Sequence, residues 1–281
     1  PPEGCGEPPT YYAVVTMDGD RMGEKLRVAN EDEQRQISRW LSTFATKKVT
    51  RIVKDHWGEL IYSGGDDVLA MLPVSTAIAA AGELAKTFRS GWPIKKQSAT
   101  VSAGIAVVHY KEDLRFALDA ARRAEVHAKE SGRDALTLAI CRRSGEHTSV
   151  LVPWSSVAEK SVTEKVDELV KHFIGGLSDR WTYALRTEVG SLPNYDAFEA
   201  ELRRLLRRTE VILSGDKTDE DQEKAKERKE KAITDCCELL SLYRDAMKAR
   251  TPNAEDRDRH ICQWFTVLCQ SASFLARGRD R

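Results

Sequence analysis

Two short apolar runs separated by a Gly-Gly-Asp-Asp sequence most constrain how this chain can fold. The stretch 61–72 reads IYSGGDDVLAML, with Gly64, Gly65, Asp66 and Asp67 at its centre. Glycine supplies the positive φ angles of a tight turn, so the stretch predicts a strand, a turn and a second strand. Adjacent carboxylates at a hairpin tip repel each other unless a cation neutralises them, and their oxygens suit Mg²⁺ or Mn²⁺. The alternative is an ordinary surface turn, because Gly and Asp are common turn residues.

A further set of carboxylates lies nearer the N-terminus. Residues 11–17 (YYAVVTM) predict a strand, and DGDRMG follows at residues 18–23. A carboxylate at the end of one strand, beside a carboxylate pair on a neighbouring hairpin, is the arrangement that two-metal phosphoryl transfer needs. Gly19 and Gly23 would let backbone amides approach a triphosphate. The two stretches together predict metal-dependent phosphoryl chemistry more specifically than either does alone.

The two motifs and a third segment resemble one protein family. DGDRMG and YSGGDD, followed by LRFALDAARRAEVHAKESGRDALTLAI at residues 114–140, resemble the second palm (cyclase-like) domain of the large subunit of type III CRISPR effector complexes, and most of all its Cmr-type branch. The resemblance covers roughly residues 11–153, and the remainder looks like the family's C-terminal helical domain. It implies an RNA-guided antiviral complex in which the palm converts ATP into cyclic oligoadenylate when target RNA is bound.

Composition excludes several classes of protein. The 281 residues include 44 Lys and Arg against 44 Asp and Glu, so no net charge draws the chain to nucleic acid and any such contact must be local. No apolar run approaches the roughly 20 residues of a membrane span, so no membrane partner is expected. Six cysteines without a CxxC pair favour a reducing cytoplasm over a zinc site or a disulfide framework.

The residue pattern predicts an α+β protein with three parts: a linker at residues 1–10, a palm domain at 11–153 and a C-terminal helical domain at 154–281. The Pro/Gly-rich start without methionine suggests a fragment, or the end, of a longer chain. In the palm, a ferredoxin-like βαββαβ core with one extra helix and strand is expected. Its predicted elements are strands at 11–17, within 61–72 and at 100–110 and 135–140, and helices at 37–53, 77–88 and 112–130.

Less regular segments are expected between and after these elements. A polar bridge is predicted at 30–36, a polar loop at 142–148 and an edge strand at 150–153. Apolar faces of period 3.6 predict a helical bundle further on. Its helices are expected at 162–173, from 181, at 195–213, 232–247 and 261–275, and the highly charged segment 215–231 predicts a mobile loop or a solvated helix start.

Basic residues near the end of the helix at 112–130 are candidates for phosphate contacts. Arg122 and Lys129 lie seven residues apart on one face, and Arg133 follows Gly132, where the helix is expected to end. A solvated basic stripe is the alternative interpretation. The run AKESGRD is similar to the AK-x-x-G-R-N segment of GGDEF-type cyclases, whose lysine holds nucleotide phosphates. The resemblance therefore implies this role for Lys129 and extends it to Arg133.

The site can then be stated by residue. The expected metal ligands, and with them the catalytic carboxylates, are Asp18 and Asp67, with Asp66 sharing the two cations and the Gly19 carbonyl as a possible backbone ligand. The 3′-hydroxyl of one ATP would attack the α-phosphate of another and expel pyrophosphate. The other expected nucleotide contacts are the backbone between Asp20 and Gly23 (with Arg21 and Met22), Lys129, Arg133, the turn glycines Gly64 and Gly65, and Ser63 against the base.

The resemblance also implies partners. In the family, the first palm domain presents the acceptor nucleotide, and this chain lacks it, so weak or no turnover is expected of the chain alone. The helical domain would dock small helical subunits, beside a neighbouring repeat-associated subunit, and meet guide RNA and target RNA indirectly. Two alternatives stay open. One is a scaffold subunit with a non-catalytic nucleotide-binding palm, and the other is a diguanylate-type cyclase, although those have Glu-Phe where this chain has Asp67-Val68.

Overall fold

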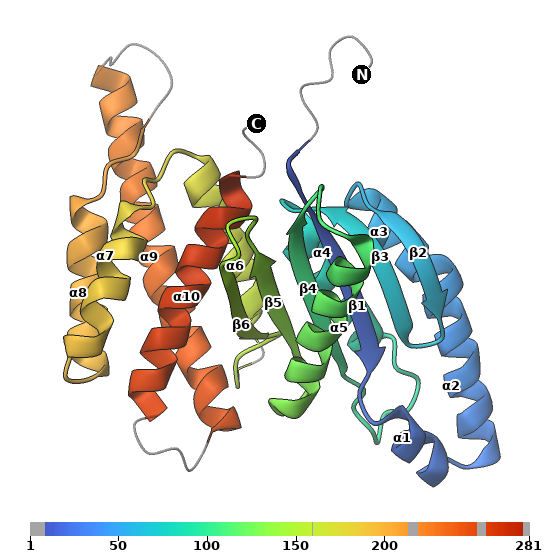
Figure 1. The fold of residues 1–281 in the computed structure, drawn as a ribbon. Coiled ribbons are helices and arrows are strands. Elements are labelled where there is room, and N and C mark those ends of the chain that lie inside the picture. Colours follow the sequence, from blue (N-terminus) through green and yellow to red (C-terminus); the bar gives the residue numbers. More distant parts are fainter. Residues whose placement is uncertain (1–8, 159, 213–218, 252–256, 278–281) are drawn as a thin grey trace. The chain divides into compact units, whose positions relative to one another are not determined.

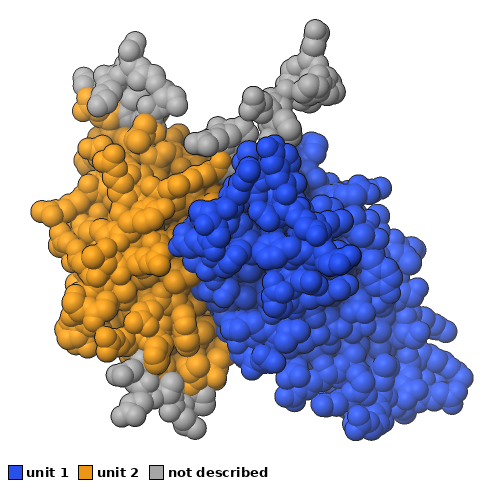
Figure 2. All heavy atoms as spheres, in the orientation of Figure 1, with its two compact units in different colours: residues 1–154 blue, residues 155–281 orange. Residues whose placement is uncertain are grey.

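The computed structural model describes residues 9–158, 160–212, 219–251 and 257–277. The chain divides into two compact units, Pro1–Trp154 and Ser155–Arg281, which are coloured separately in Figure 2. Most of the expected linker, residues 1–8, lies outside the described residues. Within the described ranges, no helix combines the length and the apolar character needed to cross a membrane.

The first unit is built on one six-stranded sheet with the strand order β2-β3-β1-β4-β5-β6. Strands β4 and β5 are parallel, and the other neighbouring strands are antiparallel. This arrangement confirms the predicted α+β, ferredoxin-like core. The strands are β1 (Tyr11–Gly19), β2 (Glu59–Gly64), β3 (Asp67–Pro73), β4 (Val101–His109), β5 (Ala135–Cys141) and β6 (His147–Pro153).

Helix α5 packs unusually closely on this sheet, and Figure 1 shows it lying across the strands. It contacts β1, β4 and β5, with Val14 and Ala106 in the buried layer between them. A Cβ atom on Gly104 would lie 2.1 Å from the Ala121 carbonyl oxygen, so only glycine allows the helix to approach this far. The Thr16 hydroxyl donates to the same carbonyl at 3.1 Å. The helices of this unit are α1 (Met22–Val28), α2 (Glu31–Thr43), the π-helix η1 (Phe44–Val49), α3 (Thr50–Asp55), α4 (Ala77–Ser90) and α5 (Leu114–Glu130).

The segment after β1 differs from the prediction. The polar bridge expected at 30–36 is wrong, because α2 begins at Glu31, and α1 precedes it. Asn30 forms a capping box: its side chain accepts from the Glu33 amide at 2.9 Å, and the Glu33 carboxylate accepts from the Asn30 amide at 3.0 Å. The first turns of α2 are largely exposed and therefore polar, so they lack the apolar period that reveals a helix.

Two other element boundaries differ from the predicted ones. The loop predicted at 142–148 is shorter, because β6 starts at His147, which pairs with Cys141 of β5. The helix predicted at 195–213 ends at Arg208, and Ile212, expected on its apolar face, is 69% exposed. In both places hydrogen bonding beyond the local segment decides the outcome. At the first, β6 pairs with β5, and at the second, Ile212 donates its amide to the Gly176 carbonyl at 2.8 Å.

The second unit is helical, as predicted. Helix α10 contacts α6, α7, α8 and α9, and the buried rings of Phe198 and Tyr243 lie 6.2 and 6.0 Å from that of Phe265. Residues 215–218 of the charged segment lie outside the described residues, and α9 is helical from Asp219. The elements are α6 (Val162–Ile174), α7 (Arg180–Glu188), the 3₁₀-helix η2 (Val189–Ser191), α8 (Tyr195–Arg208), α9 (Asp219–Arg250) and α10 (Arg257–Arg277).

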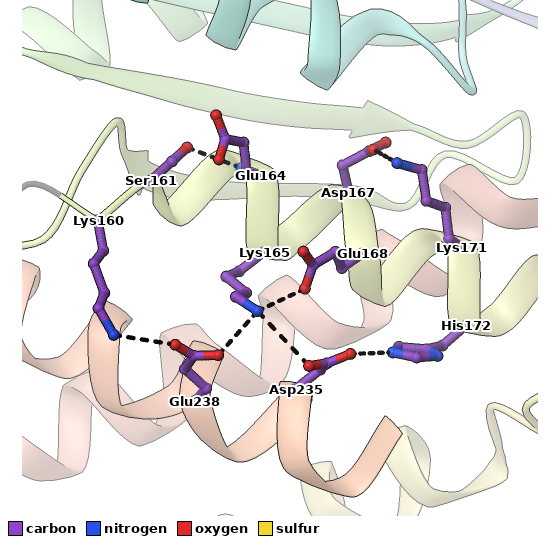
Figure 3. A network of polar contacts seen from close by, with 10 residues as sticks. All are labelled: Lys160, Ser161, Glu164, Lys165, Asp167, Glu168, Lys171, His172, Asp235 and Glu238. Atoms are coloured by element: carbon purple, nitrogen blue, oxygen red, sulfur yellow. Dashed lines mark hydrogen bonds and ion pairs between the residues drawn. The ribbon is translucent and has the colours of Figure 1, made fainter. Parts of the chain in front are cut away.

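A network of charged side chains joins α6 to α9 (Figure 3). The Lys165 ammonium lies 2.8 Å from Glu168, 2.9 Å from Glu238 and 3.7 Å from Asp235. Asp235 also contacts the His172 imidazole at 2.9 Å. Hydrogen bonds to Glu168 and Glu238 raise the pKa of Lys165, and the hydrogen bond from Lys165 lowers the pKa of Glu238. Lys165 is thus the cation on which three carboxylates converge.

Replacing Lys165 with methionine is expected to destabilise the helical unit by about 1–2 kcal/mol at pH 7, because the carboxylates facing it lose a partly buried partner. The pKa of Glu238 lies below its ordinary value of 4.5, so its contribution is present above that pH and is lost as the pH falls through the lowered pKa. Urea unfolding of both proteins should therefore give a difference at pH 7 that shrinks below about pH 4.5.

The matched control is Lys171→Met on the same helix. Among the described residues Lys171 forms an ion pair with Asp167 alone, and its side chain is 65% exposed, so its loss should cost under about 1 kcal/mol. Equal effects of the two substitutions would contradict a special role for Lys165.

Candidate active site

The three predicted metal-binding carboxylates converge at one end of the sheet. The pairing of Met17 with Val68 places the end of β1, with Asp18, beside the β2–β3 turn. Gly65 has φ 69° in that turn, as a tight hairpin requires. Asp66 accepts a hydrogen bond from the Gly19 amide, and Asp67 hydrogen-bonds to Asp18. Residues almost fifty positions apart in the sequence therefore form one acidic cluster.

Gly19 makes this close approach possible. A Cβ atom at this position would lie 2.6 Å from the Asp66 Oδ2 atom and 2.6 Å from the Met22 Cγ atom, which no real side chain tolerates. The glycine therefore allows the Asp66 carboxylate to pack against the end of β1, and its predicted backbone role toward metal or phosphate stays a prediction.

The carboxylates disturb one another's ionisation. Burial and the charge of Asp18 raise the pKa of Asp66, although hydrogen bonds from the amides of Asp66 and Gly19 partly offset this. Partial burial, the hydrogen bond with Asp18 and the charges of Asp18, Asp66 and Glu125 raise the pKa of Asp67 to about 7. Ionised carboxylates at this density are unfavourable without a nearby cation.

Lys129 supplies a positive charge to this cluster. Its ammonium lies 2.6 Å from Asp18 Oδ2 and 2.7 Å from Glu125 Oε1. Burial lowers the pKa of Lys129, but hydrogen bonds to Asp18 and Glu125 outweigh burial and raise it. Glu125 was not among the site residues predicted from the sequence. Its position four residues before Lys129 is the helical spacing of an ion pair, and that spacing could have revealed it.

The segment after β1 presents fewer candidate phosphate contacts than the sequence suggested. The Asp20 amide donates to the Thr100 carbonyl at 2.9 Å, and the Asp20 side chain is only 3% exposed. Arg21 adopts a left-handed conformation (φ 54°, ψ 37°) at the start of α1, and Met22 is buried. Gly23 is exposed, and a Cβ atom there would meet no other atom within 4 Å. The Asp20 amide is thus already hydrogen-bonded inside the protein. Arg21, Met22 and Gly23 remain as the candidate phosphate contacts of this segment.

The remaining predicted contacts lie on the hairpin and on the loop after α5. The Ser63 hydroxyl is buried and has no hydrogen-bond partner among the described residues. A Cβ atom on Gly64 would lie 2.1 Å from the Tyr62 hydroxyl, so the Tyr62 ring packs against this glycine. Arg133 has φ 62°, and its amide donates to the Ala128 carbonyl at 3.0 Å, closing the end of α5.

The chemistry of these residues fits a divalent cation. In the described part of the chain, no group of three His, Cys, Asp or Glu side chains already has the spacing of a metal-ligand set. Asp18 and Glu125 nevertheless contact Lys129, whose charge also acts on Asp66, and carboxylate oxygens are the ligands that Mg²⁺ and Mn²⁺ prefer. Asp18, Asp66 and Asp67 are the residues that would hold such an ion.

Comparison with known proteins identifies the family. Residues 11–137 match the family model for the second palm domain of Cas10/Cmr2. The chain is 31% identical over 276 residues to the CRISPR system Cmr subunit Cmr2 of Pyrococcus furiosus, an alignment that covers 85% of this chain. This chain belongs to the Cas10/Cmr2 family.

The match to the Cas10/Cmr2 relative is partial in length, since the chain spans 30% of the Pyrococcus protein. Among solved structures, the apo type III-B Cmr-beta complex, determined by cryo-EM, contains a chain with the same fold. The TM-score is 0.54 at 15% sequence identity, over 75% of this chain and 35% of that chain. The acidic cluster described above lies within residues 11–137, which match the Cas10/Cmr2 palm model.

Proposed function

We propose that this Cas10/Cmr2 palm is a metal-dependent nucleotidyltransferase that makes cyclic oligoadenylate from ATP when its CRISPR complex binds target RNA. The observation that carries the proposal is the convergence of Asp18, Asp66 and Asp67 beside Lys129. Three crowded carboxylates contribute little to a fold, whereas they suit a centre that handles phosphates through cations.

Each residue has a role in the proposed reaction. Asp18 and Asp67 are the main metal ligands, with Asp66 sharing them and the Gly19 carbonyl beside them. The bound Mg²⁺ or Mn²⁺ would lower the pKa of the attacking hydroxyl and neutralise phosphate charge. The 3′-oxygen of one ATP forms a bond to the α-phosphorus of the donor, pyrophosphate leaves, and the hydroxyl proton passes to solvent.

The position of Lys129 beside Asp18 supports the proposed nucleotide contacts. Lys129, already adjacent to Asp18, holds the donor triphosphate together with the amides of residues 21–23. The buried Ser63 hydroxyl, which has no hydrogen-bond partner in the described part of the chain, is a suitable partner for the base, because a buried polar group without a partner is costly until something binds it.

The proposal assigns distinct tasks to the two parts of the chain. The palm at 11–153 provides the donor site, and another palm domain must present the acceptor nucleotide. The helical domain at 154–281 docks small helical subunits of the effector complex, so guide and target RNA act on the palm through neighbouring subunits.

Calorimetric titration of ATP into the full chain tests this function. Binding is expected with Mn²⁺ and is expected to disappear in EDTA, and GTP should bind more weakly than ATP. A preference for GTP would favour the diguanylate-type cyclase. Binding that is indifferent to metal would favour a scaffold that holds nucleotide without catalysis.

A further inference from the structure

Asp20 is the only acidic side chain among the described residues that is nearly inaccessible to solvent, with 3% exposure. A buried carboxylate is costly unless hydrogen bonds replace its water. Its Oδ1 accepts from the Ser102 hydroxyl at 2.6 Å, and its Oδ2 accepts from the Thr100 hydroxyl at 2.7 Å and from the Asp134 amide at 3.0 Å. The carboxylate thus ties the end of β1 to the start of β4 and to the loop after α5.

That loop has a backbone conformation that needs support. Gly132, Arg133 and Asp134 have φ angles of 100°, 62° and 49°, three left-handed residues in succession, and two of them are not glycine. Such residues persist where their surroundings hold them. The Asp134 amide donates to Asp20, and the Asp134 carboxylate pairs with Arg89 of α4. Asp20 therefore provides one of the contacts that fix this turn.

The same loop continues directly from the last turn of α5, which carries Lys129. Asp18 contacts Lys129 at 2.6 Å, and Asp20, two residues later, contacts the Asp134 amide. We infer that Asp20 is a positioning residue of the site: it fixes Lys129 and Arg133 against the end of β1 and does not itself contact metal or nucleotide. The inference rests on the proposed function for its effect on nucleotide binding.

The hydrogen bonds around Asp20 require its shape more than its charge. The carbonyl of an asparagine could accept from Thr100 and from the Asp134 amide, and its NH₂ group could donate to the Ser102 hydroxyl, which can rotate to accept. Asp20→Asn should therefore preserve the anchor, whereas Asp20→Ala removes it. A metal ligand or a general base would instead need the negative charge.

The test combines ATP titration in Mn²⁺ with amide hydrogen exchange on the full chain, using wild type, Asp20→Ala and Asp20→Asn. Asp20→Ala is expected to weaken ATP binding about tenfold or more, because small misplacements of contact groups are costly. Exchange of the Asp134 amide should accelerate in this variant. Asp20→Asn should recover most of the affinity and of the protection.

Ser273→Ala controls for a general loss of stability. The Ser273 hydroxyl is also buried and donates to a carboxylate, that of Asp179, but it lies in the helical unit. This variant should melt earlier and keep its ATP affinity. The inference is overturned if Asp20→Ala binds ATP like the wild type, or if Asp20→Asn is as weak as Asp20→Ala while Asp134 exchange stays slow.

The two inferences can fail separately. If the wild type does not bind ATP, the proposed function fails, and hydrogen exchange alone decides the role of Asp20. Faster Asp134 exchange in Asp20→Ala but not in Asp20→Asn would then still support the anchor, and unchanged exchange in both would overturn it.

Discussion

Replacing Asp66 and Asp67 together with alanine is expected to abolish Mn²⁺-dependent ATP binding while leaving the fold intact. The two side chains are the hairpin's contribution to the acidic cluster, so their loss leaves Asp18 as the only proposed side-chain metal ligand. One carboxylate binds a divalent cation poorly, because these ions need several oxygen ligands. Calorimetric titration should therefore show no heat of ATP binding at concentrations that saturate the wild type.

Stability separates loss of the site from loss of the fold. The wild-type carboxylates repel one another, so removing two of them relieves a cost that offsets the hydrogen bonds lost at Asp66. In EDTA, the free energy of unfolding of the double variant should stay within about 1 kcal/mol of the wild type. Asp119→Ala removes an exposed carboxylate of α5 and should keep ATP binding. Wild-type affinity in the double variant would exclude these carboxylates as metal ligands.

Replacing Gly104 with alanine is expected to destabilise the palm unit by about 3 kcal/mol or more. The new Cβ atom would lie 2.1 Å from the Ala121 carbonyl oxygen and 2.4 Å from the Glu125 amide nitrogen. Both are backbone atoms of α5, so the whole helix has to move away from β4. For a unit of this size, the melting temperature should fall by roughly 6–12 °C, which calorimetry can measure.

Gly190→Ala is the control for this substitution, because a Cβ atom there meets no atom within 4 Å. It should leave the melting temperature nearly unchanged. ATP binding gives a second measurement for Gly104→Ala, since the displaced helix also carries Lys129 and Glu125. Equal melting temperatures for the two alanine variants would contradict the close packing of α5.

Local patterns predicted the hairpin, β4 and α5 because each has one clear signal. The hairpin has its turn glycines, and strand β4, buried along its whole length, is a continuous run of apolar and small residues up to its last residue, His109. Helix α5 alternates alanines toward the sheet with charged residues toward solvent. The start of α2 was missed for the converse reason. Its exposed turns have no apolar period, and only the capping box at Asn30 signalled a helix.

The sequence by itself determined that a strand, a glycine turn and a second strand would present two carboxylates, and that a third would follow β1. Only the tertiary structure decided which polar atoms meet across long separations. The Asp20 backbone had been expected to help hold phosphate; its amide donates to the Thr100 carbonyl, and its carboxylate meets Ser102 and the Asp134 amide, 82 and 114 residues away. Turns and periodic helices depend on neighbours along the chain. Hydrogen bonds between distant segments depend instead on how the strands of the sheet pair and on how closely Gly104 lets α5 approach the sheet.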